Sequence, residues 1–138
     1  MAAASMKPMD CPCGRTDSGG RALQLADCCG RWIDAGTAAP DAESLMRSRY
    51  TAFVLGRPEY LIATWHPSHR QADLQLDPGI KWLGLEVRWQ KQQDATHAEV
   101  EFVARQRDRS GRAVRLHELS RFVLEDGRWF YVDGDALR

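Results

Sequence analysis

Four cysteines lie close together near the amino terminus, and their spacing could hold a metal ion. They are Cys11, Cys13, Cys28 and Cys29, and the rest of the 138-residue sequence contains no cysteine. A disulfide between Cys11 and Cys13, or between Cys28 and Cys29, would close a ring too tight for the usual Cα separation. Four thiolates closing on one Zn²⁺ would complete a tetrahedral shell and leave no position for a substrate. The spacing favours one structural zinc ion, with a redox or disulfide pair and free thiols as the alternatives.

Two charged residues further along the chain interrupt apolar faces. Arg49 falls in the middle of an apolar stripe at helical spacing, and Glu118 falls in the middle of an apolar strand face. We therefore expect Arg49 to contact Glu118 between the helix and the sheet. The pair could be a buried ion pair that ties the two elements together. Alternatively, it could form the polar end of a ligand pocket, with Glu118 as a proton acceptor.

Trp65 and His66 complete this candidate pocket, with His66 at its rim. The aromatic side chains of the chain could line a cavity for a flat ligand, although aromatics at strand spacing more often fill a core. A second metal site at His66 and His69 is disfavoured, because Pro67 between them breaks any helix that would align them. No serine or cysteine nucleophile stands beside a histidine and an orienting third group, so the sequence supports no hydrolase triad.

The elements that position these residues follow from local signals. Asp41 is a good N-cap for a helix that runs to Leu55 and stops at Gly56. Pro58 is well placed to start a second helix, expected over 59–65 and ended by Pro67.

From Ile80 onward the residues alternate as in half-buried strands. In the first strand the expected buried face is Leu83, Leu85, Val87 and Trp89; in the second it is Ala98, Val100, Phe102 and Ala104. A third strand follows, and Asp126-Gly127 predicts a tight hairpin to a fourth. The order predicts an α+β domain in which the long helix packs across a strongly curved antiparallel sheet.

The expected organisation has three parts: a flexible lead over residues 1–10, a zinc knuckle over 11–36, and the α+β domain over 41–134. Lys+Arg and Asp+Glu balance at 19 each, so no global charge attracts nucleic acid, and we expect no nucleic-acid partner. No apolar run reaches the ~20 residues of a membrane span, and the first residues do not resemble a secretory signal. We therefore expect a cytoplasmic protein, in which reduced cysteines can bind metal.

Several separate blocks of residues, taken together in order, resemble the YchJ family of uncharacterised bacterial proteins. The blocks are Cys11-Pro12-Cys13-Gly14, Cys28-Cys29-Gly30, residues 45–53 (LMRSRYTAF), 63–67 (ATWHP), 84–87 (GLEV), 100–104 (VEFVA) and 116–122 (LHELSRF). The resemblance implies that the amino-terminal part is similar to the SEC-C zinc motif. This motif is also found at the carboxyl end of the secretion ATPase SecA, where it contacts protein partners. It implies that the body has the cone-shaped nuclear-transport-factor-2-like (cystatin-like) fold.

Two features depart from the family pattern. Fourteen residues separate Cys13 from Cys28, more than the motif usually has, and Gly14-Arg15-Thr16 replaces its usual Gly-Ser-Gly. We expect a lengthened loop with the ligands retained. Some members carry a second cysteine motif at the carboxyl end, whereas this sequence reaches Arg138 without one.

Two classes of function follow. The first is a non-enzymatic adaptor, in which the zinc knuckle binds a protein partner and the cone domain is a scaffold. The second is a small-molecule binding protein or an enzyme that uses the interior of the cone, a possibility raised by analogy between folds. We expect the first.

Overall fold

The computed structural model describes residues 9–138. Its elements are, in chain order, η1 (Leu25–Asp27), α1 (Gly30–Ile33), α2 (Ala42–Leu55), α3 (Pro58–Ala63), β1 (Lys81–Gln92), β2 (His97–Arg107), β3 (Ala113–Glu125) and β4 (Arg128–Ala136). Of the lead predicted over 1–10, residues 1–8 lie outside the described part. Met9 and Asp10 are paired with the knuckle, because the Leu25 N–H donates to the Met9 carbonyl at 2.8 Å and Asp10 forms a bridge with Gln24.

The long helix α2 has the bounds that its capping residues predict. The Asp41 carboxylate accepts a hydrogen bond from the Ser44 N–H at 2.7 Å, which satisfies one of the free donors of the first turn. Gly56 closes the helix with φ +72°, a conformation that glycine adopts without a steric penalty. Helix α3 begins at Pro58 and ends at Ala63, two residues earlier than predicted. The chain leaves the helix there because Trp65 forms a bridge with Tyr131 of β4.

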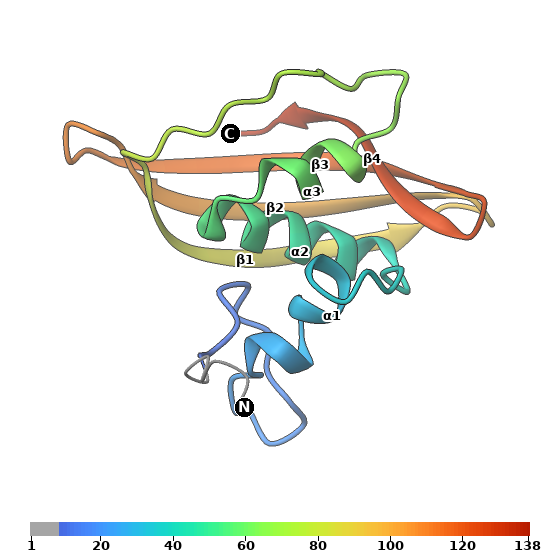
Figure 1. Cartoon of the computed structure of the whole chain (residues 1–138), viewed down its shortest axis with the longest axis horizontal. Helices are drawn as coiled ribbons and strands as arrows, with labels where there is room; N and C mark the ends of the chain where they lie inside the picture. Colours follow the sequence, from blue (N-terminus) through green and yellow to red (C-terminus); the bar gives the residue numbers. More distant parts are fainter. Residues whose placement is uncertain (1–8) are drawn as a thin grey trace, which may run out of the picture.

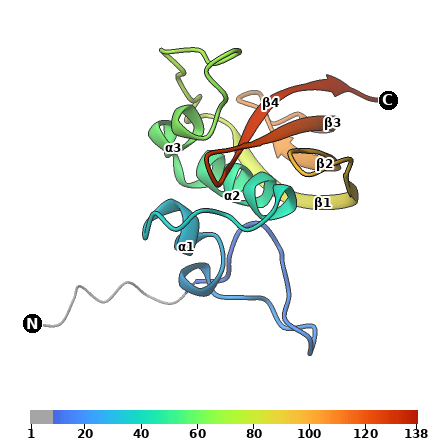
Figure 2. The ribbon, with the colours of Figure 1, turned by 90° about the vertical axis from the view of Figure 1, so that its right-hand side faces the viewer.

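The four strands form one antiparallel meander in the order β1-β2-β3-β4. Asp126 and Gly127 connect β3 to β4 with φ +52° and +78°, as expected for a two-residue hairpin with both central residues at positive φ. Helices α2 and α3 lie across one face of this sheet (Figure 1). Figure 2 shows the amino-terminal knuckle on the side of α2 away from β3 and β4. The α+β architecture predicted from the sequence is thus confirmed.

The buried face predicted for β1 is wrong at both ends. Two β-bulges interrupt the register with β2, between Trp82 and Gly84 and between Val87 and Trp89. Each bulge adds one residue and turns the following side chain to the other face. Leu85 and Val87 therefore pack toward the helices, whereas Leu83 (45% exposed) and Trp89 (43% exposed) do not. The expected face of β2 is confirmed, since Ala98, Val100, Phe102 and Ala104 all belong to the core or pack against it.

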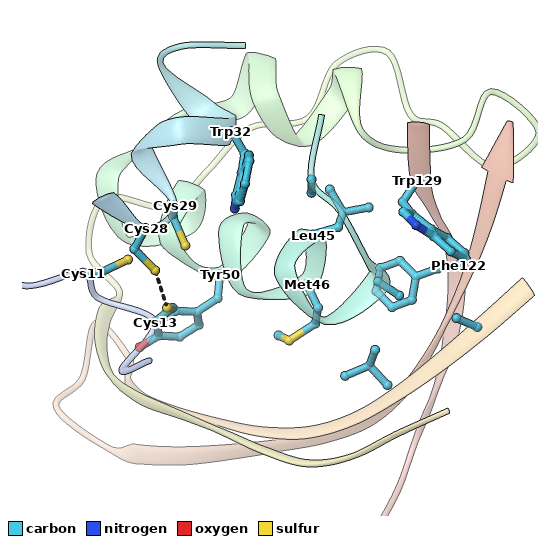
Figure 3. Packing of buried hydrophobic residues seen from close by; sticks show 14 of the residues in the cluster. Cys11, Cys13, Cys28, Cys29, Trp32, Leu45, Met46, Tyr50, Phe122 and Trp129 are labelled. Carbon is cyan, nitrogen blue, oxygen red and sulfur yellow. Dashed lines mark hydrogen bonds between the residues drawn. The ribbon is translucent and has the colours of Figure 1, made fainter. Parts of the chain in front are cut away.

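One hydrophobic core extends from the cysteine knuckle into the cone. The same cluster of buried residues contains the four cysteines and Trp32 of the knuckle, Leu45, Met46 and Tyr50 of α2, and Phe122 and Trp129 of the sheet. Figure 3 shows these side chains around α2, with the strands curving beneath it. The short knuckle thus buries its apolar side against the body. Within the described residues, no helix is both long and apolar enough to cross a membrane.

Candidate metal centre and ligand pocket

The four cysteines meet at one buried point. Their sulfur atoms all lie within 4.8 Å of one another, and Cys13 Sγ lies 3.6 Å from Cys28 Sγ. The four sulfur atoms point toward one another in Figure 3. In a tetrahedral site with Zn–S bonds of about 2.3 Å, sulfur atoms are about 3.8 Å apart. The spacing therefore fits a four-thiolate metal site closed to other ligands.

Two backbone turns bring the pairs together. The Gly14 N–H donates to the Cys11 carbonyl at 3.2 Å, which folds the first pair into a tight turn, and the Cys11 N–H donates to Leu23 at 2.8 Å. Cys28 follows η1, and Gly30 is the first residue of α1. The Gly30 Cα lies against the Leu25 backbone, so a Cβ at this position would be 2.7 Å from the Leu25 carbonyl oxygen. Glycine is thus required after the second cysteine pair for steric reasons.

The four thiols influence one another's ionisation. Hydrogen bonds from the Cys13 and Cys29 thiols lower the pKa of Cys11. Burial and the nearby Cys13 raise the pKa of Cys28 to about 12, and the bonds with Cys11 and Cys13, followed by burial, raise the pKa of Cys29. The protein groups alone thus stabilise one thiolate at the expense of its neighbours. Four thiolates at this point require a bound cation.

Polar contacts fix the knuckle on α2. Arg47 Nη1 donates to the Cys13 carbonyl at 3.0 Å, and Arg47 Nε donates to Glu43 at 2.8 Å. Glu43 also lies 3.4 Å from Arg15 Nη2, so one carboxylate is shared between the helix and the knuckle. Cys11 Sγ lies 3.7 Å from Thr51 Oγ1. The cysteine site is therefore anchored to the helix that also faces the cone.

A cavity of about 580 Å³ lies between α2 and the sheet. This volume falls in the range of small-molecule sites, and most of the lining side chains are apolar. The lining residues are Met46, Arg49, Tyr50, Phe53, Trp65, Leu74, Ile80, Trp82, Phe102, Ala104, Gln106, Arg115, Leu116, His117, Glu118, Ser120, Phe122, Tyr131, Ala136 and Leu137. Of the predicted pocket residues, Arg49, Trp65 and Glu118 line this cavity.

Arg49 and Glu118 share the cavity, but the predicted direct contact between them is wrong. Arg49 Nη1 donates to the Leu61 carbonyl and to Thr64 Oγ1, both at 2.7 Å, and the guanidinium lies over the Tyr131 ring, 4.6 Å from its centroid. Glu118 accepts hydrogen bonds from Ser120 Oγ at 2.5 Å and from the Tyr131 hydroxyl at 3.4 Å. Tyr131 thus contacts both charges, Arg49 through the face of its ring and Glu118 through its hydroxyl.

Burial shapes the ionisation of these groups. Arg49 is 9% exposed, and burial lowers its pKa to about 10, against attractions to Tyr131, Tyr60 and Glu118 that raise it. Burial and the Glu118 carboxylate raise the pKa of Tyr131 to about 12, so its hydroxyl remains a hydrogen-bond donor at neutral pH.

His66 does not line the cavity. Its backbone N–H donates to the Tyr131 carbonyl at 2.7 Å, and its ring bonds to Glu125 through Nε2 and to Ser68 through Nδ1, each at 2.7 Å. His69 Nδ1 lies 2.8 Å from Ser68 Oγ. The Trp65–Tyr131 bridge holds this turn at the edge of β4 and directs His66 away from the cone.

Sequence reasoning included Tyr131 only among the aromatic residues that could line a cavity, and it missed Gln106. Tyr131 was an aromatic among others, and only its position between Arg49 and Glu118 distinguishes it. The side-chain oxygen of Gln106 is buried and has no hydrogen-bond partner among the described residues, although Gln106 lines the cavity. A glutamine on the apolar face of β2 was the signal that could have identified it.

Comparisons with known proteins agree with this architecture. The family model for the middle, NTF2-like domain of YchJ matches residues 41–134. A UPF0225 protein of Polaromonas sp. (strain JS666) is 64% identical over 138 residues, covering 99% of each chain. A UPF0225 protein of Bordetella pertussis is 57% identical and covers 93% of each chain.

Two solved structures extend the likeness to the amino-terminal part. The solution structure of a SEC-C motif containing protein from Rhodopseudomonas palustris matches with a TM-score of 0.78 and 31% identity, covering 94% of this chain and 100% of that one. The crystal structure of a SEC-C motif containing protein from Psychrobacter arcticus matches with a TM-score of 0.75 and 32% identity, covering 94% of this chain and 83% of that one. The chain therefore belongs to the YchJ (UPF0225) family, with a SEC-C-like cysteine cluster ahead of an NTF2-like domain.

Proposed function

We propose that this protein binds a small molecule in the cavity of its cone domain and that a zinc ion in the cysteine cluster holds the wall of that cavity in place. The observation that carries the proposal is the cavity itself, about 580 Å³ in volume, with aromatic walls and buried polar groups inside. Core packing alone would leave few voids larger than a water molecule. A space of this size with convergent polar groups is the common form of a ligand site.

A library screen tests the cavity as a binding site. Ala136 lines the cavity and is exposed, so Ala136→Trp should block the space with little effect on the core. Ala113→Trp is the matched control, because Ala113 is exposed and does not line the cavity. Compounds that bind should raise the Tm of the wild type and of Ala113→Trp, but not that of Ala136→Trp. Compounds that stabilise all three proteins equally, or a diverse library without a single hit, would refute the proposal.

Zinc is the metal we assign to the cluster, because four buried cysteines with this spacing match its preferred ligands. A reducing cytoplasm would keep the four thiols available for it. Metal analysis of protein purified without added zinc should find one Zn²⁺ per chain. Cys28→Ser should lose the metal, and Ala26→Ser, an exposed position in the same segment, should keep it. Metal-free protein that still has an ordered knuckle would contradict the assignment.

An adaptor role is the second candidate, and a projecting hairpin supports it. The lengthened loop between the cysteine pairs forms a small hairpin in which Thr16 bridges Ala22, and residues 16–22 are all exposed. This hairpin extends away from α2 in Figure 2 and could contact a protein partner. A version with the hairpin shortened to two glycines should keep its zinc and lose any partner recovered with the full chain. A partner that binds both versions equally would exclude the hairpin as the contact.

A further inference from the structure

The side chain of Arg49 is incompletely paired inside the cavity. Both hydrogen bonds of its guanidinium use Nη1 and go to uncharged acceptors, the Leu61 carbonyl and Thr64 Oγ1. Among the residues that the structure describes, Nε and Nη2 have no acceptor, and no carboxylate forms an ion pair with Arg49. The edge of a guanidinium formed by Nε and Nη2 is one that binds carboxylates with two parallel hydrogen bonds.

A buried cation without a partner is costly, so its surroundings should supply a negative charge when the site is in use. Burial is the largest influence on Arg49 and opposes its charge. Glu118 gives a partial attraction through space, but its Oε2 atom accepts hydrogen bonds from Ser120 and from the Tyr131 hydroxyl and forms none with Arg49. The guanidinium therefore remains available to an anion that enters the cavity.

The rest of the cavity indicates what the anion carries. Trp82 forms an edge contact with Tyr50, with ring centroids 5.5 Å apart, and lies 5.6 Å from Phe53, so one wall consists of three aromatic rings. Such walls favour a flat, apolar body over a sugar or a phosphate ester.

The unpaired oxygen of Gln106 adds a second polar point. Gln106 lies four residues along β2 from Phe102, which pairs with Glu118. At a strand rise of about 3.3 Å per residue, this places Gln106 about 13 Å from that pair. A hydroxyl at the far end of the ligand would satisfy the Gln106 oxygen.

We propose that the cavity selects aromatic carboxylates, with the carboxylate on the free edge of Arg49 and a hydrogen-bond donor directed to Gln106. This inference rests on the proposed function, because it specifies the chemistry of the ligand in the same cavity. It assigns Arg49 as the residue that distinguishes an acid from its neutral analogue.

Two isosteric probes, naphthoate and naphthamide, test this selectivity by calorimetry on the full, metal-loaded chain. They have nearly the same shape and differ in charge. Naphthoate should bind the wild type at least about tenfold more tightly, the size expected for one charge-assisted hydrogen bond. A hydroxynaphthoate should bind more tightly still, and Gln106→Leu should remove only that gain.

Variants of Arg49 locate the effect. Arg49→Gln should abolish the preference for naphthoate, and Arg49→Lys should reduce it, because lysine keeps the charge and loses the planar edge. Arg88→Gln is the matched control, since Arg88 lies on β1, is exposed and does not line the cavity. Circular dichroism should show that each variant is folded, and the wild-type comparison of the two probes remains decisive if Arg49→Gln is not.

The outcomes separate the inference from the proposed function. Equal affinity of the wild type for naphthoate and naphthamide would overturn the inference and leave the cavity as a ligand site. If neither probe binds, the inference also falls, and the proposed function falls with it only when the library screen finds no other ligand. An unchanged preference in folded Arg49→Gln would show that another group selects the acid.

Discussion

A double-mutant cycle on Arg49 and Glu118 measures whether Tyr131 separates the two charges, as the structure shows. The variants are Arg49→Met, Glu118→Gln and the double mutant. Arg49→Met removes two hydrogen bonds from a charged donor, each worth about 1.5–3 kcal/mol. Part of this loss is offset, because a buried charge no longer has to be desolvated and methionine fills the space of the arginine stem.

The two acceptors that lose Arg49, the Leu61 carbonyl and Thr64 Oγ1, keep other hydrogen-bond contacts. Thr64 Oγ1 already donates to the Tyr60 carbonyl at 2.7 Å and lies 3.4 Å from the Leu61 carbonyl. We therefore expect a net loss of about 2–3 kcal/mol in the free energy of unfolding. Glu118→Gln keeps an acceptor oxygen for Ser120 and Tyr131, so it should cost about 1 kcal/mol or less.

The coupling between the two sites should then be about 1 kcal/mol or less, because no direct contact is lost twice. The measurement is urea unfolding of the metal-loaded proteins at neutral pH, followed by tryptophan fluorescence. Arg88→Met, an exposed position, should change stability by about 0.5 kcal/mol at most. A direct buried ion pair would give single losses of about 3–5 kcal/mol and a double mutant that recovers much of them. That result would refute the separation of Arg49 and Glu118.

Three further outcomes are expected. Gly134→Ala should destabilise the protein by about 1–3 kcal/mol, because a Cβ there would overlap the Glu118 carboxylate, and adding Glu118→Ala should restore much of the loss in urea unfolding. Gly30→Ala should weaken zinc retention against a competing chelator, because the new Cβ meets the Leu25 carbonyl, whereas an unchanged retention would show that the turn can widen. Because the folded-state pKa of Tyr131 is raised to about 12, its contribution is complete below the unfolded pKa of about 10 and is lost as the pH rises toward 12. The stability of Tyr131→Phe should therefore fall less steeply than that of the wild type as the pH rises between these values. Equal losses of Tm with pH in the two proteins would contradict the raised pKa.

The features that the sequence predicted correctly are those set by neighbours in the chain. Asp41 caps its helix through the Ser44 N–H three residues on, and Gly56 ends the same helix by its own backbone conformation. The turn at Asp126-Gly127 likewise depends on two adjacent residues. The four cysteines could be grouped from the sequence because their crowding has few chemical explanations.

The arrangement around Glu118 could not be predicted because it depends on a β-bulge. Arg121 pairs with Asp133 and Phe122 pairs with Tyr131, so Val132 is an extra residue in β4. Without the bulge, strict alternation after Tyr131 would direct Asp133 and Asp135 into the cone. With the bulge, both aspartates turn outward to Arg121, and the small residues Gly134 and Ala136 lie beside Glu118. Alternation along one strand does not reveal where such an insertion falls.

The His66 and Arg49 predictions failed for a related reason. Arg49 was assigned to the apolar stripe of its helix and His66 to the rim of the pocket, but the groups that bind their side chains lie on other elements. The Arg49 hydrogen bonds go to α3 and to the residue that follows it, and His66 is fixed by the Tyr131 carbonyl and by Glu125. Periodicity assigns a side chain to a face and leaves its partner open.

Helix α2 shows most clearly how the two candidate sites are linked. Its sequence predicts one apolar stripe and a polar remainder, yet the polar residues Ser44, Ser48 and Thr51 are as buried as the apolar ones. Ser44 and Thr51 contact the knuckle through Arg15 and Cys11, and Ser48 contacts Tyr60 of α3.

The helix is thus enclosed on several sides, and its polar positions are the contacts that orient it. The knuckle holds one side through Arg47 and Thr51, while Met46 and Arg49 line the cavity on the other. Because one helix carries both sets of contacts, a metal ion that orders the cysteines would also fix the position of Arg49 relative to the sheet. We therefore propose that metal binding in the cysteine cluster has a structural role, namely to hold the α2 wall of the cone at a set distance from the sheet.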